Sequence, residues 1–120
     1  MATAQQLINV AVRNFEREVP ALAKLKLAFR LELRGRGDVQ MFRVEVPGPT
    51  ISKAVADDAR VTVSIPRSHF NELATEGRVR HYREAFEHGH IKVSGDPNVL
   101  KLVAQVVERH EQRARLKKVR

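Results

Sequence analysis

The spacing of the apolar residues changes twice along this chain of 120 residues, and this change limits the fold more than any other feature. Apolar residues first recur every three or four positions, as on one face of a helix. Between Leu25 and Ile65 they mostly alternate with polar residues, as in strands with one buried face. From Val99 to His110 the helical spacing returns. Strands in a run with helices at the two ends predict an α+β sheet covered on one face by helices, rather than a doubly wound nucleotide-binding sheet.

Both terminal helices carry signals for their first residues. Thr3 and Gln6 have the spacing of a capping box, and the apolar pattern that follows stops before Pro20. Near the other end, Asp96 is a favourable N-cap with Pro97 at the first helical position. The last helix then carries one apolar stripe, formed by Val99, Leu102, Val103, Val106, Val107 and His110, with Leu100 on its flank. We therefore expect one amphipathic helix at each end of the chain.

The first strands form a predicted hairpin. Apolar and polar residues alternate from Leu25 to Leu33, and the turn Gly35-Arg36-Gly37-Asp38 follows. The next strand, Val39 to Val46, should return antiparallel. Its alternation slips at Met41-Phe42, which predicts a bulge there.

The second half of the sheet is predicted from shorter segments. Ile51 to Val55 has the pattern of a short edge strand, and Val61 to Ile65 that of another half-buried strand. A short helix through Phe70 should end at Gly77, and a second, from about Tyr82 to His88, at Gly89. Ile91 and Val93 then mark a last strand.

Three groups of residues in this second half form a recognisable set: the pair Gly77-Arg78, the pair Ala85-Phe86 shortly before Gly89, and the run Ile91-Lys92-Val93-Ser94-Gly95-Asp96. With the order of segments around them, from Ala59 to Val107, they resemble the type-two sterol carrier protein family. The resemblance implies a mixed, mainly antiparallel sheet of about five strands, covered on one face by helices. It also implies an internal apolar cavity between sheet and helices that holds a lipid.

The resemblance and the broad apolar arc of the last helix together suggest a ligand site. We expect the ligand to be a fatty acyl, sterol-like or other apolar molecule, bound and carried without chemistry. The residues expected to line its cavity are Phe70, Leu73, Phe86, Leu100, Val103 and Val107. The last four residues, Lys117-Lys118-Val119-Arg120, differ from a peroxisomal Ser-Lys-Leu address, which fits a cytoplasmic stand-alone domain better than a peroxisomal one.

Length and composition agree with one folded domain over residues 1–120. Hydrophobic residues make up 42% of the chain, and no apolar run approaches the ~20 residues of a membrane span. The N-terminus lacks the design of a signal peptide, so we expect a cytoplasmic protein. Cysteine is absent, which excludes disulfides, thiolate metal sites and cysteine nucleophiles.

Most of the net charge of +8 lies in a basic C-terminal tail at residues 109–120. The tail holds six basic residues and one acid, Glu111, and so contributes +5. Such a tail can bind an anionic membrane surface, and the residues expected to make that contact are Arg113, Arg115, Lys117 and Lys118. The alternative is a solvated helix end whose cations suit the helix dipole.

The sequence offers little support for catalysis. His88 and His90 could share a metal, but solvated histidines are favoured because only Glu84 or Glu87 could add a ligand nearby. The serines lack a nucleophile motif, and Gly35-Arg36-Gly37 lacks the Lys-Ser/Thr pair of a phosphate loop. We expect no enzyme activity, no cofactor, no catalytic residue and no metal site.

Two alternatives to lipid carriage stay open. The first is nucleic-acid binding, which the basic charge allows. It is disfavoured because all five phenylalanines lie on predicted apolar faces and so are expected in the core, not on a stacking platform. The second is an accessory role, in which the domain serves a separately encoded enzyme.

Overall fold

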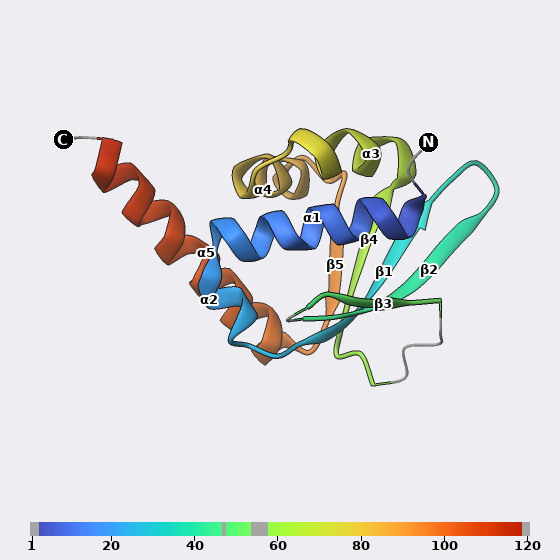
Figure 1. Cartoon of the computed structure of the whole chain (residues 1–120), viewed down its shortest axis with the longest axis horizontal. Helices are drawn as coiled ribbons and strands as arrows, with labels where there is room; N and C mark the ends of the chain where they lie inside the picture. Colours follow the sequence, from blue (N-terminus) through green and yellow to red (C-terminus); the bar gives the residue numbers. More distant parts are fainter. Residues whose placement is uncertain (1–2, 47, 54–57, 119–120) are drawn as a thin grey trace.

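The computed structural model describes residues 3–46, 48–53 and 58–118. Its helices and strands are, in chain order, α1 (Ala4–Glu18), α2 (Pro20–Ala23), β1 (Ala28–Arg34), β2 (Val39–Glu45), β3 (Thr50–Ser52), β4 (Val61–Pro66), α3 (Arg67–Glu76), α4 (Val79–Glu87), β5 (Lys92–Gly95) and α5 (Pro97–Lys118). The five strands form one sheet in the order β3-β2-β1-β4-β5 (Figure 1). β1 and β4 are parallel and the other neighbours are antiparallel, so the predicted mixed, mainly antiparallel sheet is confirmed.

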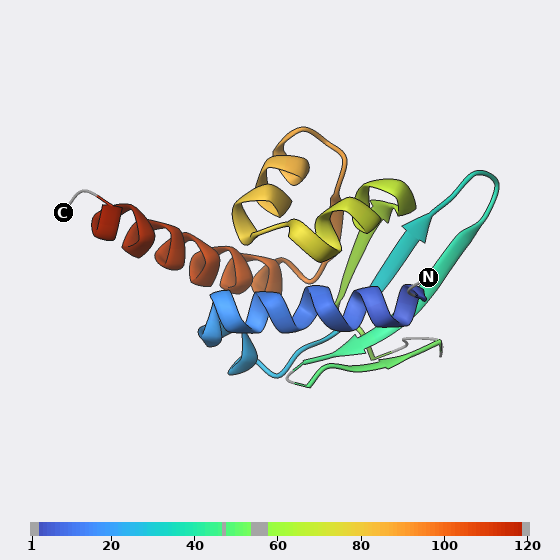
Figure 2. The ribbon, with the colours of Figure 1, turned by 45° about the horizontal axis from the view of Figure 1, so that its top comes forward.

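Helices cover one face of this sheet. The core lies between that face and α1, α3 and α4, and its buried residues are Ile8, Ala11, Leu31, Leu33, Phe42, Val44, Ile65, Phe70, Ala74, Ala85 and Ile91. Every second residue of β1 and β2 points into it, as the alternation predicts. Figures 1 and 2 show α1 lying across the sheet, with α3 and α4 beside it.

The predicted starts of the two terminal helices are confirmed. The Thr3 side chain accepts a hydrogen bond from the Gln6 backbone N–H at 3.2 Å, and the Gln6 side chain accepts one from the Thr3 N–H at 2.8 Å. Asp96 Oδ1 accepts from the Asn98 N–H at 2.9 Å, as an N-cap should. Pro20 ends α1 as predicted, but it also begins α2, a single helical turn that the sequence pattern did not indicate.

The predicted bulge at Met41-Phe42 is wrong. β1 and β2 pair one to one, with Leu31 opposite Phe42 and Glu32 opposite Met41. Val39 and Met41 instead lie on the face of the sheet away from the helices, where they are 52% and 50% exposed. The alternation slips because these positions carry apolar residues on the solvent side.

Two strand boundaries also differ from the prediction. β1 begins at Ala28, because the Leu25 N–H donates to the Leu22 carbonyl in a turn after α2 and Lys26 has a φ of 51°. The expected edge strand from Ile51 is confirmed as the edge strand β3, which ends at Ser52. The rest of that prediction, at residues 54 and 55, lies outside the described residues.

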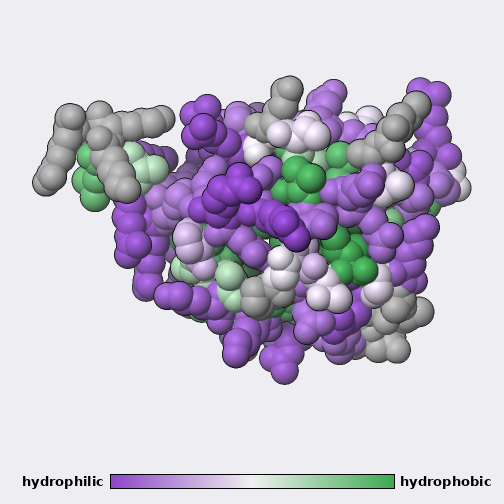
Figure 3. All heavy atoms as spheres, in the orientation of Figure 1, coloured by the Kyte–Doolittle hydropathy of each residue, from purple (hydrophilic) through white to green (hydrophobic). Residues whose placement is uncertain are grey.

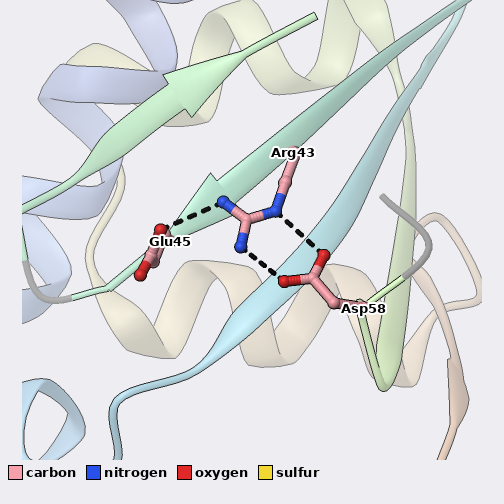
Figure 4. Close-up of polar contacts among 3 residues, drawn as sticks. All are labelled: Arg43, Glu45 and Asp58. Carbon is pink, nitrogen blue, oxygen red and sulfur yellow. Dashed lines mark hydrogen bonds and ion pairs between the residues drawn. The ribbon is translucent and has the colours of Figure 1, made fainter. Parts of the chain in front are cut away.

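On the face of the sheet away from the core, Arg43 joins two segments of the chain (Figure 4). Its Nε and Nη2 donate to the two carboxylate oxygens of Asp58 at 2.9 and 2.5 Å, and its Nη1 lies 3.0 Å from Glu45 Oε2. These bonds, chiefly the one to Asp58, raise the pKa of the Arg43 guanidinium, and the same bond lowers the pKa of the Asp58 carboxyl. The contact ties β2 to the turn that precedes β4.

Candidate functional site

The structure places the six residues expected to line a ligand in three different settings. Phe70, on α3, is 3% exposed and belongs to the core, and Leu73, one turn later, packs against that core from a partly buried position. Val103 and Val107 lie in the apolar stripe of α5 and Leu100 lies on its flank, and each of the three is half-buried. The structure thus groups two of the six on α3 and three on α5.

The sixth residue, Phe86, lies apart from these groups. It is 51% exposed, whereas Ala85 beside it is buried. The inner face of α4 is formed by Val79, Tyr82 and Ala85, at intervals of three residues, which turns Phe86 to the side of the helix. The expectation that all five phenylalanines lie in the core is therefore wrong for Phe86.

Helix α5 carries an apolar stripe that is incompletely buried. None of its described side chains is buried, and none belongs to the core. It packs on α2 and β5 and then extends beyond the body of the molecule (Figures 1 and 2). Leu102, which the spacing placed in the stripe, is 44% exposed. The apolar stripe of α5 is thus only half covered.

A polar seam joins α5 to the helices beside it. We use this name for Glu18, Arg83, His110 and Glu111. Glu18 Oε2 accepts a hydrogen bond from the Val79 N–H at 3.0 Å and lies 3.7 Å from His110 Nε2. Arg83 Nη1 lies 3.0 Å from Glu111 Oε2. The C-terminal end of α1, the first turn of α4 and the middle of α5 are thereby linked through side chains.

A surface hollow of about 340 Å³ lies next to this seam. Its lining combines polar and apolar side chains from the end of α1 and from the joint between α3 and α4: Asn14, Phe15, Arg17, Glu18, Thr75, Gly77, Arg78 and Val79. At Gly77 the joint passes so close to α3 that a Cβ atom would lie 2.5 Å from the Leu73 carbonyl oxygen. The pair Gly77-Arg78, singled out in the sequence, therefore forms one wall of the hollow.

Tyr82, on the inner face of α4, packs against Phe15, which lines the hollow. Its ring lies 4.6 Å from that of Phe15, between centroids, at an interplanar angle of 59°. Its hydroxyl is buried and has no hydrogen-bond partner among the described residues. Burial raises the pKa of this phenol, so the hydroxyl stays protonated and remains a hydrogen-bond donor. Tyr82 is not among the site residues expected from the sequence, although Tyr82 is spaced three residues from both Val79 and Ala85.

Three of the four histidines outside the seam lie close together. The rings of His69 and His90 stack with centroids 4.8 Å apart, and the His88 ring lies 6.5 Å from that of His90. Over the described ranges of the chain, no group of three or more His, Asp or Glu residues is placed to hold a metal ion. The sequence motif His88-Gly89-His90 does not predict the contact between His90 and His69, because that contact forms only in the folded chain.

Some hydrophobic side chains reach the surface of the molecule. Figure 3 shows hydrophobic side chains reaching the surface in patches on the face seen in Figure 1, among hydrophilic ones. No helix in the described residues is long and apolar enough to cross a bilayer.

Comparisons with known proteins relate the chain to one family. The sequence profile described as the SCP-2 sterol transfer family matches residues 4–108. No curated protein matches the chain significantly. Similar solved structures include the palmitated Sterol Carrier Protein 2 Like 2 of Aedes aegypti, with a TM-score of 0.56 and 17% identity, covering 83% of this chain and 93% of that one.

Two further solved structures share the fold. Sterol Carrier Protein 2 of Yarrowia lipolytica, in its apo form, has a TM-score of 0.52 and 15% identity, covering 74% of this chain and 81% of that one. A ubiquinone synthesis protein described as UbiJ-SCP2 has a TM-score of 0.52 and 18% identity, covering 86% and 91%. At such identities the likeness shows the fold alone.

Proposed function

Because this chain belongs to the SCP-2 sterol transfer family, we propose that it binds a fatty acyl or sterol-like lipid beneath α5 and carries it in the cytoplasm without changing it chemically. The observation that carries this proposal is the half-covered apolar stripe of α5. An amphipathic helix of a globular domain ordinarily buries such a stripe against the core. Here the core is closed by α1, α3 and α4, and the stripe of α5 is left over.

An apolar ligand would complete the burial of that stripe. Each methylene removed from water contributes about 0.8 kcal/mol, so roughly ten buried methylenes supply about 8 kcal/mol. That free energy corresponds to a dissociation constant near ~1 μM before ordering costs are subtracted. Burial of hydrocarbon is therefore sufficient for reversible carriage, and no reactive side chain is required.

The expected site residues have distinct parts in this proposal. Leu100, Val103 and Val107 line the ligand from α5. Phe70 and Leu73 belong to the packed layer against which the ligand rests, and Phe86 lies at its rim. The buried Tyr82 hydroxyl, which has no partner in the described part of the protein, would donate a hydrogen bond to the polar end of the ligand.

A second candidate follows from the fold shared with the ubiquinone synthesis protein. The domain could hold an apolar substrate for a separately encoded enzyme, as an accessory rather than as a free carrier. Both candidates need the same ligand site. They differ in whether the loaded protein associates with another protein, which size-exclusion chromatography of the native complex distinguishes.

The ligand site is tested by placing a charge on the stripe. Val103→Asp should weaken binding of a fluorescent fatty acid at least about tenfold, because burying a carboxylate without a partner costs several kcal/mol. Gln105→Asp is the matched control, since Gln105 is an exposed residue of the same helix and its variant should bind like the parent. Fluorescence titration gives both affinities, and native mass spectrometry detects any lipid that co-purifies.

Two outcomes would contradict the carrier proposal. One is that fatty acids and sterols all fail to bind at micromolar concentration while no lipid co-purifies. The other is equal affinity of the Val103→Asp and Gln105→Asp variants. The His88→Ala/His90→Ala double variant should retain binding, since both side chains are exposed, and loss of a stoichiometric metal from it would reopen a metal-dependent function.

A further inference from the structure

From Arg109 to Leu116 the exposed charged side chains of α5 are all cations. Arg109, Arg113 and Arg115 are exposed, and Lys117 and Lys118 extend the helix beyond them. Glu111, the one acid in residues 109–120 of the sequence, is only 15% exposed and pairs with Arg83 on α4. In this segment the fold therefore withdraws the negative charge of Glu111 from the surface and leaves Arg109, Arg113 and Arg115 exposed.

Exposed leucines accompany these cations. Leu102 is 44% exposed and Leu116 is 69% exposed. Leu102, Arg109 and Leu116 follow one another at intervals of seven residues and so lie on one side of the helix, and Arg113 lies on the same side. We call these four residues the arginine-leucine row. Single exposed leucines are common on protein surfaces, but a row shared with arginines is the pattern of an interfacial helix.

The position of α5 leaves this row accessible. The molecule measures 47 × 29 × 25 Å, and Figures 1 and 2 show α5 extending from the sheet toward the C-terminus, away from the other elements. Figure 3 shows hydrophobic side chains at that far end, separate from the body of the molecule. A projecting helix of this kind can lie flat on an extended surface.

We propose that the arginine-leucine row docks the protein on a bilayer surface rich in anionic lipids. The arginines are attracted to the negative headgroups, and their aliphatic stems let them remain there while the leucines enter the acyl boundary. Apart from Leu102, which is exposed, the apolar stripe of α5 is not used, so docking does not require a bound ligand. This interaction goes beyond the proposed carriage and can succeed or fail independently of it.

A bilayer fits the row better than a nucleic acid does. Single-stranded nucleic acids are bound by cations together with aromatic platforms on which the bases stack. The sequence of α5 contains no Phe, Tyr or Trp, and its exposed apolar side chains in the row are leucines. Leucine contributes to insertion among acyl chains and offers no stacking surface.

The test is sedimentation of the full chain with vesicles of phosphatidylcholine, alone or mixed in equal parts with phosphatidylglycerol. The parent protein should bind the acidic vesicles and not the neutral ones, and salt should release it. The variant Arg109→Gln/Arg113→Gln/Arg115→Gln removes both arginines of the row together with Arg115, an exposed cation of α5 outside the row, and should partition to acidic vesicles at least about tenfold more weakly. Leu102→Ser/Leu116→Ser should also weaken binding while leaving its salt dependence unchanged.

The matched control removes the same charge elsewhere. Arg36→Gln/Arg80→Gln/Lys92→Gln changes three exposed cations on the β1–β2 turn, α4 and β5 and should bind acidic vesicles like the parent within about twofold. All variants keep the Arg83–Glu111 pair, and circular dichroism confirms that they fold. Equal loss in the two triple variants would show that only net charge matters and would overturn the proposal. Binding to single-stranded DNA in place of vesicles, lost in the first triple variant, would overturn it as well.

Discussion

Phe70 and Phe86 are the same residue type at apolar positions of two neighbouring helices, yet one is buried and the other is exposed. Phe70 is 3% exposed and Phe86 is 51% exposed. Phe70→Ala should therefore lower the free energy of unfolding by about 3–5 kcal/mol, because it leaves a cavity in the core. Phe86→Ala should lower it by less than about 1 kcal/mol and act on ligand affinity instead. Urea denaturation with and without a fatty acid separates the two effects, and comparable destabilisation by both changes would contradict this assignment.

Arg43 and Asp58 hold β2 to the turn before β4. The stability that this contact contributes to the fold should depend on pH. The pKa of Asp58 is lower in the folded protein than in the unfolded chain, because Arg43 stabilises the carboxylate. The stabilisation is complete above the unfolded pKa of about 3.9 and is lost as the pH falls through the lowered folded pKa. Asp58→Asn should therefore lower the Tm at neutral pH, and the difference from the parent should disappear in strong acid. A Tm difference that is the same at both pH values would mean that the carboxylate charge is not responsible.

The whole molecule combines a closed core with a helix whose apolar stripe is half covered. If a lipid binds beneath α5 as proposed, the stability of the protein should rise. A ligand that binds only the folded state adds about 2.7 kcal/mol at a free concentration of one hundred times its Kd. That gain should raise the Tm by several degrees in a domain of this size. Hydrogen exchange should slow most in α5 and least in the β1–β2 hairpin, which is already paired. An unchanged Tm at saturating fatty acid would place binding, if any, outside the folded interior.

The sequence alone predicted every element except α2, although not every boundary, because most of their signals are local. Thr3 with Gln6 and Asp96 with Pro97 satisfy backbone N–H groups within one helical turn, so the starts of α1 and α5 could be predicted without any knowledge of the rest. Alternation identified β1, β2 and β4, and the Gly-rich turn identified the hairpin that β1 forms with β2. The family resemblance rested on short runs of the same local kind, and the matched profile confirms it.

Tertiary structure alone decided which apolar residues face the core and which distant side chains meet. Met41 was expected at a bulge and Phe86 in the core, yet both are about half exposed, because hydropathy does not state which side of an element is covered. The seam contact between Glu18 and His110 joins the end of α1 to α5, and the parallel pairing of β1 with β4 joins strands that are not consecutive. Such contacts depend on how elements pack in three dimensions, and no local pattern specifies them. The proposed ligand site rests on the half-covered stripe of α5 and on the Tyr82 hydroxyl, which has no partner in the described part of the chain. For the same reason both became visible only in the folded molecule.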